Sequence, residues 1–519
     1  MPSHPAILLT TLNAKYIHAS LGLRYLLANM GELRHQTALR EFTIARPAEQ
    51  IVTELLVSLP PAPAVGIIGF GVYIWNVTQT TAVIRRLKEL RPEIRIVLGG
   101  PEVSHEFADQ EIVRLADYLI TGWGDLSFAK LCHALLHGPR PLNKVIAGEQ
   151  PPLSEITLPY EGYTDEDLKH RLLYVEASRG CPFKCEFCLS ALDKSAWAFD
   201  LSLFLVEMQR LYDRGARNFK FVDRTFNLKV ETSVRILQFF LDRLAESEDK
   251  LFVHFEVIPD HLPEALKAMI ARFPPGVLQF EVGIQSFNSD VQQRISRRQD
   301  NAKSEANLRW LLSESNAHLH TDLIFGLPGE SLASFAAGFD RLYALGPHEI
   351  QLGILKRLRG TPIARHTVAF GMVFDPLPPY TVTQTGAVDR ETMQKFSRFA
   401  RYWDMIANSG RFPMTLKYLL RDAPSPFAAF MAFADWLWAL TGKTSGLSPE
   451  MLVDAFFAYF SSLPQSDVSQ ARQCLLADYL ASGARSNPLA LQGLLPKREK
   501  PASQASTLTH RQARHLAAQ

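Results

Sequence analysis

Three of the chain's five cysteines fall in one short run, Arg179-Gly180-Cys181-Pro182-Phe183-Lys184-Cys185-Glu186-Phe187-Cys188. Their spacing is C-x3-C-x2-C, and thiolates grouped in this way are soft ligands suited to zinc or to an iron–sulfur cluster. A closed zinc site and an ordinary cubane both use four protein ligands. With only three cysteines close together, one iron of a four-iron cubane would stay open, where it can bind a small molecule and pass an electron to it.

Three alternative roles for these cysteines fit the run less well. Buried free cysteines would not stand beside Lys184 and Glu186, which are poor core residues. A zinc site of three cysteines and one histidine would need a histidine with paired spacing, and the nearest one upstream, His170, has none. A disulfide framework belongs to short, cysteine-rich secreted chains, whereas Cys132 and Cys474 each stand alone in apolar surroundings.

The segment CPFKCEFC resembles the signature of the radical S-adenosylmethionine (SAM) superfamily. In that family the open iron chelates the amino and carboxylate groups of SAM, and an electron then cleaves the sulfonium. The resemblance implies that Cys181, Cys185 and Cys188 hold a 4Fe-4S cluster. It also places Phe187 beside the cluster and SAM.

A barrel must position these cysteines. Strand and helix patterns alternate six times between Tyr174 and about residue 360, which predicts a partial (β/α)6 barrel of the TIM type. The expected strands are 172–176, 218–222, 251–256, 278–283, 319–325 and 349–355. The expected helices are 203–214, 232–247, 262–271, 303–313 and 332–345. The cysteine run follows the first strand, on the carboxyl-terminal face where barrel chemistry occurs.

Four later segments resemble superfamily elements, in the correct order behind the cysteines. They read FVDRTFN at 221–227, FEVGIQS at 280–286, TDLIFGLPGE at 321–330 and KRLRGTP at 356–362. The resemblance implies SAM contacts by Phe187, Asp223, Glu281, Gln285, Ser286, Arg297, Ile324 and Gly326. Asp223 could equally begin a helix or pair with Arg224. Glu281 and Gln285 share one strand face, where a ligand hydroxyl or Arg297 or Arg298 would satisfy them.

The first 140 residues predict an open α/β domain with a parallel sheet. The expected strands are 6–12, 40–44, 65–72, 95–98 and 117–121, and the expected helices are 21–30, 77–90 and 126–136. Glycine- or aromatic-rich loops follow four of these strands, where α/β sheets bind ligands. Alternatively, the glycines merely make tight turns.

This pattern, with LGGPEVS and DYLITGWGD, resembles the Rossmann-like cobalamin-binding domain that precedes many radical SAM cores. The resemblance implies cobalamin contacts by Asn13, Lys15, Tyr16, His18, Gly71, Tyr73, Trp75, Asn76, Gly99, Gly100, Pro101, Glu102, Gly122 and Gly124. Domains that supply a histidine to cobalt read D-x-H-x-x-G, whereas this chain has Lys15 at the histidine position. His18 has the wrong offset, so the expectation is a cobalamin without a protein histidine on cobalt.

Proline-rich stretches mark the remaining boundaries. We expect a cobalamin-binding domain at 1–140, a linker at 141–170 and the radical SAM barrel at 171–365. A mainly helical domain at 366–495 follows, because aromatic residues recur there at helical spacing. It resembles a C-terminal domain of unassigned role in one cobalamin-dependent radical SAM subgroup, and it packs either as ordinary helices or as a substrate lid. The polar segment 496–519 predicts a disordered tail.

Composition narrows the class further. The chain is 47% hydrophobic and 21% charged, as in soluble globular proteins, and its net charge of +2 gives no signal for nucleic acid. No apolar run reaches the roughly 18 residues that span a bilayer, and no secretory signal is visible at Met1. A reducing, cytoplasmic location is therefore expected.

The leading functional prediction is a cobalamin-dependent radical SAM methyltransferase, with a 4Fe-4S cluster, SAM and cobalamin as cofactors. It would transfer a methyl group to an unactivated carbon through a 5′-deoxyadenosyl radical and methylcobalamin. The substrate is an unidentified small molecule or peptide, and a flavodoxin or ferredoxin would donate electrons. A non-methylating rearrangement or cyclisation is the first alternative. A non-enzymatic cobalamin sensor is another, and a tRNA methylthiotransferase lacks support because no second cysteine triad or basic RNA-binding domain is present.

Overall fold

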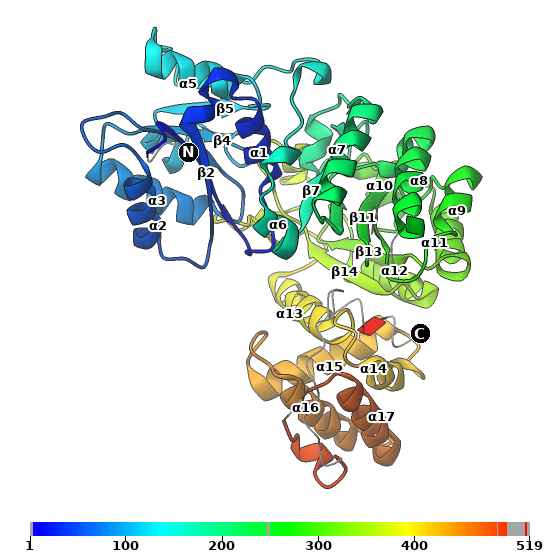
Figure 1. The fold of residues 1–519 in the computed structure, drawn as a ribbon. Helices are drawn as coiled ribbons and strands as arrows, with labels where there is room; N and C mark the ends of the chain where they lie inside the picture. Colours follow the sequence, from blue (N-terminus) through cyan, green and yellow to red (C-terminus); the bar gives the residue numbers. More distant parts are fainter. Residues whose placement is uncertain (1–3, 247–249, 485, 496–513, 516–519) are drawn as a thin grey trace. The chain divides into compact units, whose positions relative to one another are not determined.

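The computed structural model describes residues 4–246, 250–484, 486–495 and 514–515. The chain divides into two units, drawn together in Figure 1. Unit 1 comprises Met1–Arg224, Lys356–Ala364 and Asp375–Thr381, and unit 2 comprises Thr225–Leu355, Arg365–Phe374 and Val382–Gln519. Of the predicted tail, only residues 514 and 515 belong to the described residues, so the predicted disorder stays a prediction.

Unit 1 begins with a six-stranded parallel sheet in the order β2-β1-β3-β4-β5-β6. Its strands are β1 (Ile7–Asn13), β2 (Thr37–Thr43), β3 (Ile67–Gly71), β4 (Arg95–Gly99), β5 (Tyr118–Thr121) and β6 (Val145–Ala147). The interior strand β1 is buried along its whole length, as expected for an apolar run covered on both faces. All strands are parallel, so the loops that follow them meet at one edge of the sheet.

Helices cover both faces of this sheet (Figure 1). One core packs Leu8, Ile68 and Leu98 against α2 (Ala48–Ser58) and α3 (Val77–Leu90). The other packs the alternate residues Leu9 and Val97 against α1 (Leu21–Ala28) and α5 (Ser127–His137). Side chains alternate across a strand, so each strand contributes to both cores.

The predicted N-terminal α/β fold is confirmed, with three additions: α2, the short helix α4 (Glu111–Leu115) and β6. Helix α2 was not expected, because prolines on both sides of it obscure a short apolar face formed by Ile51, Val52 and Leu55. Strand β6 was not expected either and lies inside the predicted linker. It is a three-residue edge strand with an exposed pattern, and such a strand carries no apolar signal.

The barrel strands alternate with helices along the chain, in agreement with the predicted partial (β/α)6 barrel. In unit 1, β7 (Leu173–Val175) pairs in parallel with β10 (Asn218–Phe221), and α7 (Leu201–Asp213) lies between them in sequence. In unit 2, four strands pair in parallel in chain order: β11 (Phe252–Val257), β12 (Leu278–Gln285), β13 (His318–Phe325) and β14 (Glu349–Ile354). Their helices are α8 (Val230–Glu246), α9 (Glu264–Ile270), α10 (Ser289–Arg294), α11 (Asn301–Glu314) and α12 (Leu332–Leu345).

The C-terminal part of unit 2 is helical, as predicted. It contains α13 (Arg390–Ile406), α14 (Pro413–Leu420), α15 (Pro426–Thr441), α16 (Pro449–Ser462) and α17 (Val468–Ala481). Two of these helices begin with a serine N-cap followed by proline at the first helical position, the order that favours initiation.

The aromatic stripe of α13 is a packing face. Trp403 lies 4.9 Å from Phe339 of α12 between ring centroids, and Phe396 lies 5.0 Å from Phe335 of the same helix. The rings therefore pack on the outside of a barrel helix, which favours ordinary helical packing over a substrate lid.

Asn408, after α13, completes the open edge of β14. Its side-chain amide donates to the carbonyl of Ile350 at 2.9 Å and accepts from the amide of the same residue at 3.0 Å. Asn408 is buried, so these two bonds replace those that a neighbouring strand would make.

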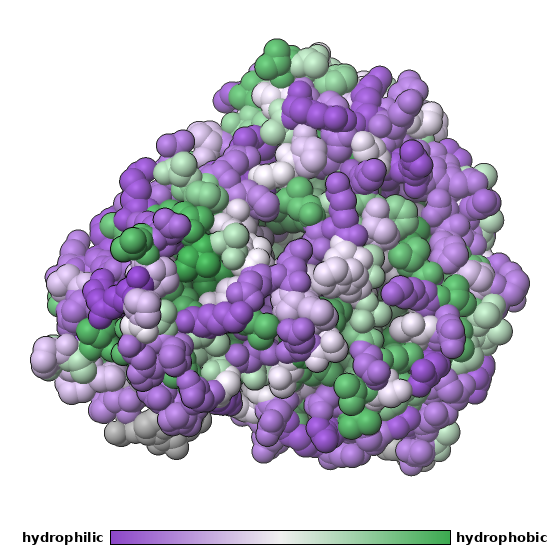
Figure 2. Space-filling view, turned by 90° about the horizontal axis from the view of Figure 1, so that it is seen from above, coloured by the Kyte–Doolittle hydropathy of each residue, from purple (hydrophilic) through white to green (hydrophobic). Residues whose placement is uncertain are grey.

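No helix among the described residues is long and apolar enough to cross a membrane. The face seen in Figure 2 is mostly hydrophilic, and its apolar side chains occur in small separate groups.

We predict that Asn408→Ala lowers the free energy of unfolding by about 2–3 kcal/mol, because a buried backbone donor and acceptor both lose their partners. Urea unfolding followed by tryptophan fluorescence would measure this loss. Gln470→Ala on the exposed surface of α17 is the control and should change stability by less than about 0.5 kcal/mol. Equal stability of the two variants would contradict the proposed edge-capping role.

Candidate functional site

The cysteine loop leaves β7 through the short strand β8 (Ser178–Arg179). Cys181 and Cys185 are buried and Cys188 is half-buried, and all three are thiols outside any disulfide. The amide of Cys181 donates to the Asp193 carbonyl at 2.9 Å, which closes the loop. Gly180 has φ +83°, and a Cβ there would lie 2.6 Å from the Ser195 hydroxyl, so this position requires glycine.

The donor set fits a cubane better than a single metal ion. Among the described residues, no three histidine, cysteine or acidic side chains are grouped closely enough to hold one ion. Each cysteine of a cubane binds a different iron, so the sulfur atoms must stand apart. Burial raises the pKa of Cys181, and the neighbouring Cys188 and Cys185 thiolates raise it further. The three thiols are therefore close enough to interact electrostatically, but they are not arranged around a single ion.

The other two cysteines take no part in this loop. Cys132 lies on α5 and is fully buried in the core, and burial raises the pKa of its thiol far above the usual value. Cys474 lies on α17 in unit 2.

Asp223 supports the segment that leads into the cysteines. Its carboxylate accepts from the Ala177 amide at 3.0 Å and from the Ser178 hydroxyl at 2.6 Å. It is 4% exposed, and burial raises its pKa to about 7. Neither sequence-based alternative, a helix-capping acid or a pair with Arg224, foresaw this role.

The predicted SAM-side residues of unit 2 lie within β12 and β13 or shortly after them. Gln285 has φ +68°, and the Arg297 guanidinium donates to the Gly283 carbonyl. Glu281 lies 3.2 Å from Nε2 of His254, measured from its Oε2 atom. Gly326, which follows Ile324 by two residues, has φ +87°, and a Cβ there would lie 2.6 Å from the Val382 side chain. Phe187, in unit 1, is half-buried and stands between Cys185 and Cys188 in the sequence.

Ser286 uses its hydroxyl inside the protein. It is buried, donates to Oε1 of Glu330 at 2.5 Å and accepts from the Asn288 amide at 3.1 Å. Glu330 is 1% exposed, and burial raises its pKa to about 7. Ser286 is thus placed to orient the end of β12, and its contact with SAM stays a prediction.

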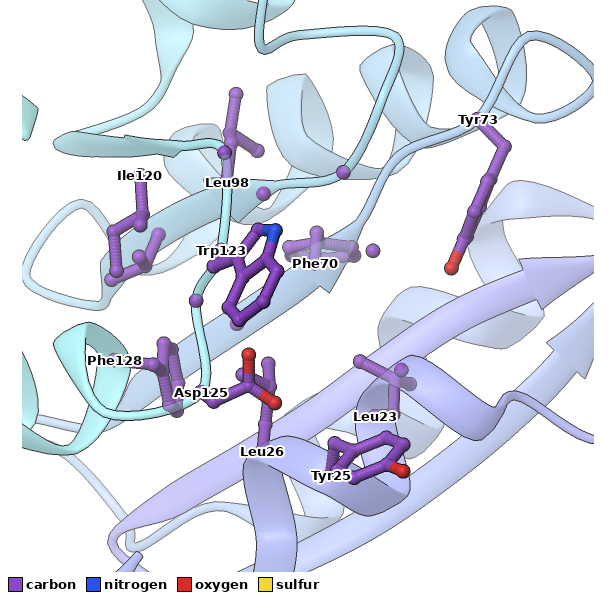
Figure 3. Close-up of a pocket in the computed structure, with 18 of the residues that line it drawn as sticks. Leu23, Tyr25, Leu26, Phe70, Tyr73, Leu98, Ile120, Trp123, Asp125 and Phe128 are labelled. Atoms are coloured by element: carbon purple, nitrogen blue, oxygen red, sulfur yellow. The ribbon is translucent and has the colours of Figure 1, made fainter. Parts of the chain in front are cut away.

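A cavity of about 250 Å³ opens at the carboxyl ends of β3, β4 and β5 in unit 1. Its wall is largely apolar and carries the rings of Phe70, Tyr73, Trp123 and Phe128 (Figure 3). Seven glycines complete the lining: Gly22, Gly69, Gly71, Gly99, Gly100, Gly122 and Gly124. Backbone without side chains allows a large flat ligand to approach closely, so the lining suits contact with part of a corrinoid.

Six of the residues predicted to contact cobalamin line this cavity: Gly71, Tyr73, Gly99, Gly100, Gly122 and Gly124. Trp75 is 47% exposed and stacks on Tyr73, with ring centroids 4.4 Å apart. Asn76 is buried and its amide donates to the Leu12 carbonyl at 3.0 Å, so it fixes the loop itself. Pro101 and Glu102 follow Gly99 and Gly100 at the end of β4 and lie outside the lining.

The loop after β1 is held away from the cavity lining. Asn13 donates to Glu41 at 2.9 Å, and Arg171 donates to the carbonyls of Tyr16 and His18 at 2.8 and 3.0 Å. Nδ1 of His18 lies 2.7 Å from the Tyr174 hydroxyl. Burial lowers the pKa of His18, and Lys220, Lys15 and Arg171 lower it further. Neither His18 nor the exposed Lys15 lines the described cavity, and no other histidine does.

Arg179 joins the cavity to the cysteine loop. Its guanidinium lines the cavity and donates twice to Asp125, at 2.9 and 3.0 Å, while its Nε donates to Glu176 at 2.7 Å. Its carbon Cζ lies 4.3 Å from the ring centroid of Tyr25 and 5.0 Å from that of Trp123. Although burial opposes the charged form, Glu176 and Asp125 raise the pKa of Arg179, so it stays a cation. This residue stands two positions before Cys181.

Four residues of the site were not selected from the sequence: Arg179, Asp125, Trp123 and Tyr25. Two signals were present, since Trp123 and Asp125 stand on either side of the selected Gly124, and Arg179 begins the cysteine run. Tyr25 lay unremarked within a predicted helix.

Comparison with known families finds three domains in this chain. Residues 7–132 match the B12 binding domain, residues 175–342 match the radical SAM superfamily, and residues 368–516 match a protein family of unknown function, DUF4080.

Among curated proteins, the chain is similar to a 2-(S-pantetheinyl)-carbapenam-3-carboxylate methyltransferase of Streptantibioticus cattleyicolor. The two are 25% identical over 314 residues, or 54% of this chain and 45% of the relative. It is also similar to the cobalamin-dependent radical SAM methyltransferase TokK of Streptomyces tokunonensis, with 23% identity over 321 residues, or 56% and 47%. The chain therefore spans less than half the length of these curated relatives.

Solved structures share the fold. The radical enzyme OxsB with aqua-cobalamin and SAM bound aligns with a TM-score of 0.61 and 14% identity over 99% of this chain and 83% of that one. The methyltransferase TsrM of Kitasatospora setae aligns with a TM-score of 0.56 and 14% identity over 92% and 100%.

The chain belongs to the cobalamin-binding radical SAM enzymes, because a B12 binding domain precedes a radical SAM domain within it. Its cofactors are a 4Fe-4S cluster, SAM and cobalamin. The thiols of the cysteine loop and the glycine-lined cavity fit two of these groups by their own chemistry. The individual contacts to each cofactor remain predictions.

We predict that Arg179→Lys weakens the binding of hydroxocobalamin by about tenfold, because lysine keeps the charge but loses the two-pronged bond to Asp125. Titration followed by the absorbance of the bound corrinoid would measure the change. Arg210→Lys on α7 alters an exposed ion pair in the same unit and should bind like the wild type. Wild-type affinity in Arg179→Lys would show that the pair does not shape the cavity.

We also predict a pH dependence of stability caused by Glu330. Its folded pKa of about 7 lies above the usual 4.5, so its contribution to stability is complete below pH 4.5 and is lost as the pH rises through 7. The expected loss is about 3 kcal/mol. Glu330→Gln keeps the acceptor for Ser286 and should remove this part of the pH profile, measured by urea unfolding between pH 4.5 and 8. Glu264→Gln, at an 88% exposed side chain, should leave the profile unchanged.

Proposed function

We propose that this protein is a cobalamin-dependent radical SAM methyltransferase that acts on an unactivated carbon of a small molecule or peptide. The observation that carries the proposal is Arg179, which lines the glycine-rich cavity and stands two residues before Cys181. A corrinoid site and a cluster site that share a wall residue suit a reaction that uses both groups on one substrate.

When bound, the cluster with SAM supplies a hydrogen-abstracting 5′-deoxyadenosyl radical, and the corrinoid supplies a methyl group. The protein's own residues bind, orient and shield. Asp223 holds Ala177 and Ser178 at the entry to the cysteine loop. Arg179 and Asp125 hold that loop against the cavity, and the rings of Tyr25 and Trp123 around the guanidinium exclude water from the pair.

The cavity lining supports a cobalt without a protein histidine. Among the described lining residues, Asp125 and Arg179 carry the only charged side chains, and both are engaged with each other. After one-electron reduction, the hydroxocobalamin-loaded protein should therefore give an electron paramagnetic resonance spectrum without coupling to a protein histidine nitrogen.

Anaerobic reconstitution with iron, sulfide and hydroxocobalamin, followed by SAM and a flavodoxin or dithionite as reductant, tests the function. Methyl transfer predicts S-adenosylhomocysteine together with 5′-deoxyadenosine when extracts of candidate substrates are supplied. Formation of 5′-deoxyadenosine alone would favour a non-methylating rearrangement. Corrinoid binding without any SAM cleavage would favour a cobalamin sensor.

We predict that Cys185→Ala reduces bound iron from about four atoms per chain to a background level and abolishes 5′-deoxyadenosine formation. Hydroxocobalamin binding should persist, since Cys185 does not line the cavity. Iron analysis and product chromatography measure the two effects. Cys474→Ala removes a thiol remote in sequence from the cysteine run and is the matched control. Undiminished SAM cleavage in Cys185→Ala would show that Cys185 is not a ligand of the cluster.

A further inference from the structure

A short segment after the last barrel strand contacts both the corrinoid-domain loop and the cysteine loop. We call residues 357–363 the strap. They belong to unit 1, together with both of the loops that they touch. The strap carries the sequence RLRGTPI, whose closing motif was expected only to end the barrel.

The first contact is a buried carboxylate. Glu102 is 4% exposed and lies two residues after Gly100, whose backbone lines the cavity. Its Oε1 accepts from Nε of Arg359 at 2.9 Å and from the Tyr380 hydroxyl at 2.6 Å. Arg359 also donates to the Tyr380 hydroxyl at 2.9 Å. A carboxylate this deeply buried requires such partners, because an unpaired charge in the interior is strongly unfavourable.

The second contact lies one turn further along the same loop. Oε1 of Glu106 accepts from the Gly360 amide at 3.1 Å, and its Oε2 lies 3.1 Å from the Arg357 guanidinium. Gly360 has φ +79°, and a Cβ there would overlap the imidazole of His105. Glycine at this position therefore permits the strap to lie directly on the loop.

The third contact reaches the cysteine loop. The amide of Ile363 donates to the carbonyl of Glu186 at 3.0 Å, and Glu186 stands directly after Cys185. The strap keeps its turn between these contacts because the Thr361 hydroxyl donates to the Leu358 carbonyl at 2.5 Å. A turn of seven residues thus joins the backbone of the cluster loop to the loop that forms one wall of the corrinoid cavity.

We propose that the strap positions the corrinoid loop, residues 99–106, and the cysteine loop relative to each other. Arg359 is its positioning residue. The proposal rests on the proposed function for its catalytic consequence, because only an enzyme that uses both groups needs their spacing held. Its structural part, the coupling of two loops, stands on the contacts alone. Loosening the strap should loosen both loops and separate SAM cleavage from corrinoid use.

Hydrogen exchange of the hydroxocobalamin-loaded, cluster-reconstituted protein tests the coupling. Arg359→Met removes the bonds to Glu102 and Tyr380, and we expect about tenfold faster exchange of amides in residues 99–106 and in residues 185–189. Retention of hydroxocobalamin on a desalting column should fall in parallel. The ratio of 5′-deoxyadenosine to S-adenosylhomocysteine in turnover should rise, since radical formation would continue without methyl transfer.

Gly360→Ala is a second variant that leaves every charge in place. The new Cβ would overlap His105, so amides in residues 99–106 and 185–189 should again exchange faster than in the wild type. Gly215→Ala is its matched control, because Gly215 also has a positive φ, +99°, but no atom lies within 4 Å of the added carbon. Arg85→Lys, at an exposed ion pair of the same domain, controls for the loss of an arginine.

Faster exchange confined to the strap itself, in both variants, would overturn the proposal. Faster exchange in residues 99–106 without change in residues 185–189 would also overturn it, because the strap would then serve only one loop. If the wild type cleaves no SAM, the proposed function fails, whereas the exchange results still decide whether the strap couples the loops.

Discussion

One largely buried cation determines how the site in unit 1 is assembled. Arg179 has no access to bulk water sufficient to solvate its charge, so it requires acidic partners, and it finds them in Asp125 and Glu176. Asp125 belongs to the loop after β5, and Glu176 lies between β7 and the cysteine run. The need to neutralise one guanidinium therefore joins the cavity of the N-terminal domain to the loop that carries the cluster ligands.

The strap also joins two loops through a buried charge and its partner, but with the charges reversed. Here the buried group is a carboxylate, Glu102, and the cation comes from Arg359 in a segment more than 250 residues later in the chain. Both connections use geometrically demanding bonds of arginine. Arg179 stands two residues before Cys181, and the strap that carries Arg359 bonds to Glu186, the residue after Cys185. Such pairs contribute little to net stability compared with apolar packing, but they restrict the arrangement to one register because any other leaves a charge buried alone.

Several residues predicted to contact a cofactor also shape the backbone. Asp223, Ser286 and Asn76 each direct their polar atoms to neighbouring main-chain or side-chain groups. A motif shows that a polar residue is needed at a strand end. It does not tell whether that residue touches the ligand itself or holds the loop that touches the ligand. Conversely, Tyr25 lacks any motif signal, and only its position against Arg179 makes it part of the site.

The sequence by itself determined the cysteine spacing, the order of strands and helices, and the glycines at the strand ends. These features are local, since periodicity, turn chemistry and ligand spacing are set by residues close together in the chain. The short edge strand β6 and the helix α2 escaped prediction because their apolar signal is weak or interrupted. Only the tertiary structure decided that His18 faces Tyr174 rather than the cavity, and that Arg179 and Glu102 find partners in distant segments. Pairing of buried charges depends on which loops meet at one edge of a sheet, and that meeting is a property of the fold rather than of any stretch of sequence.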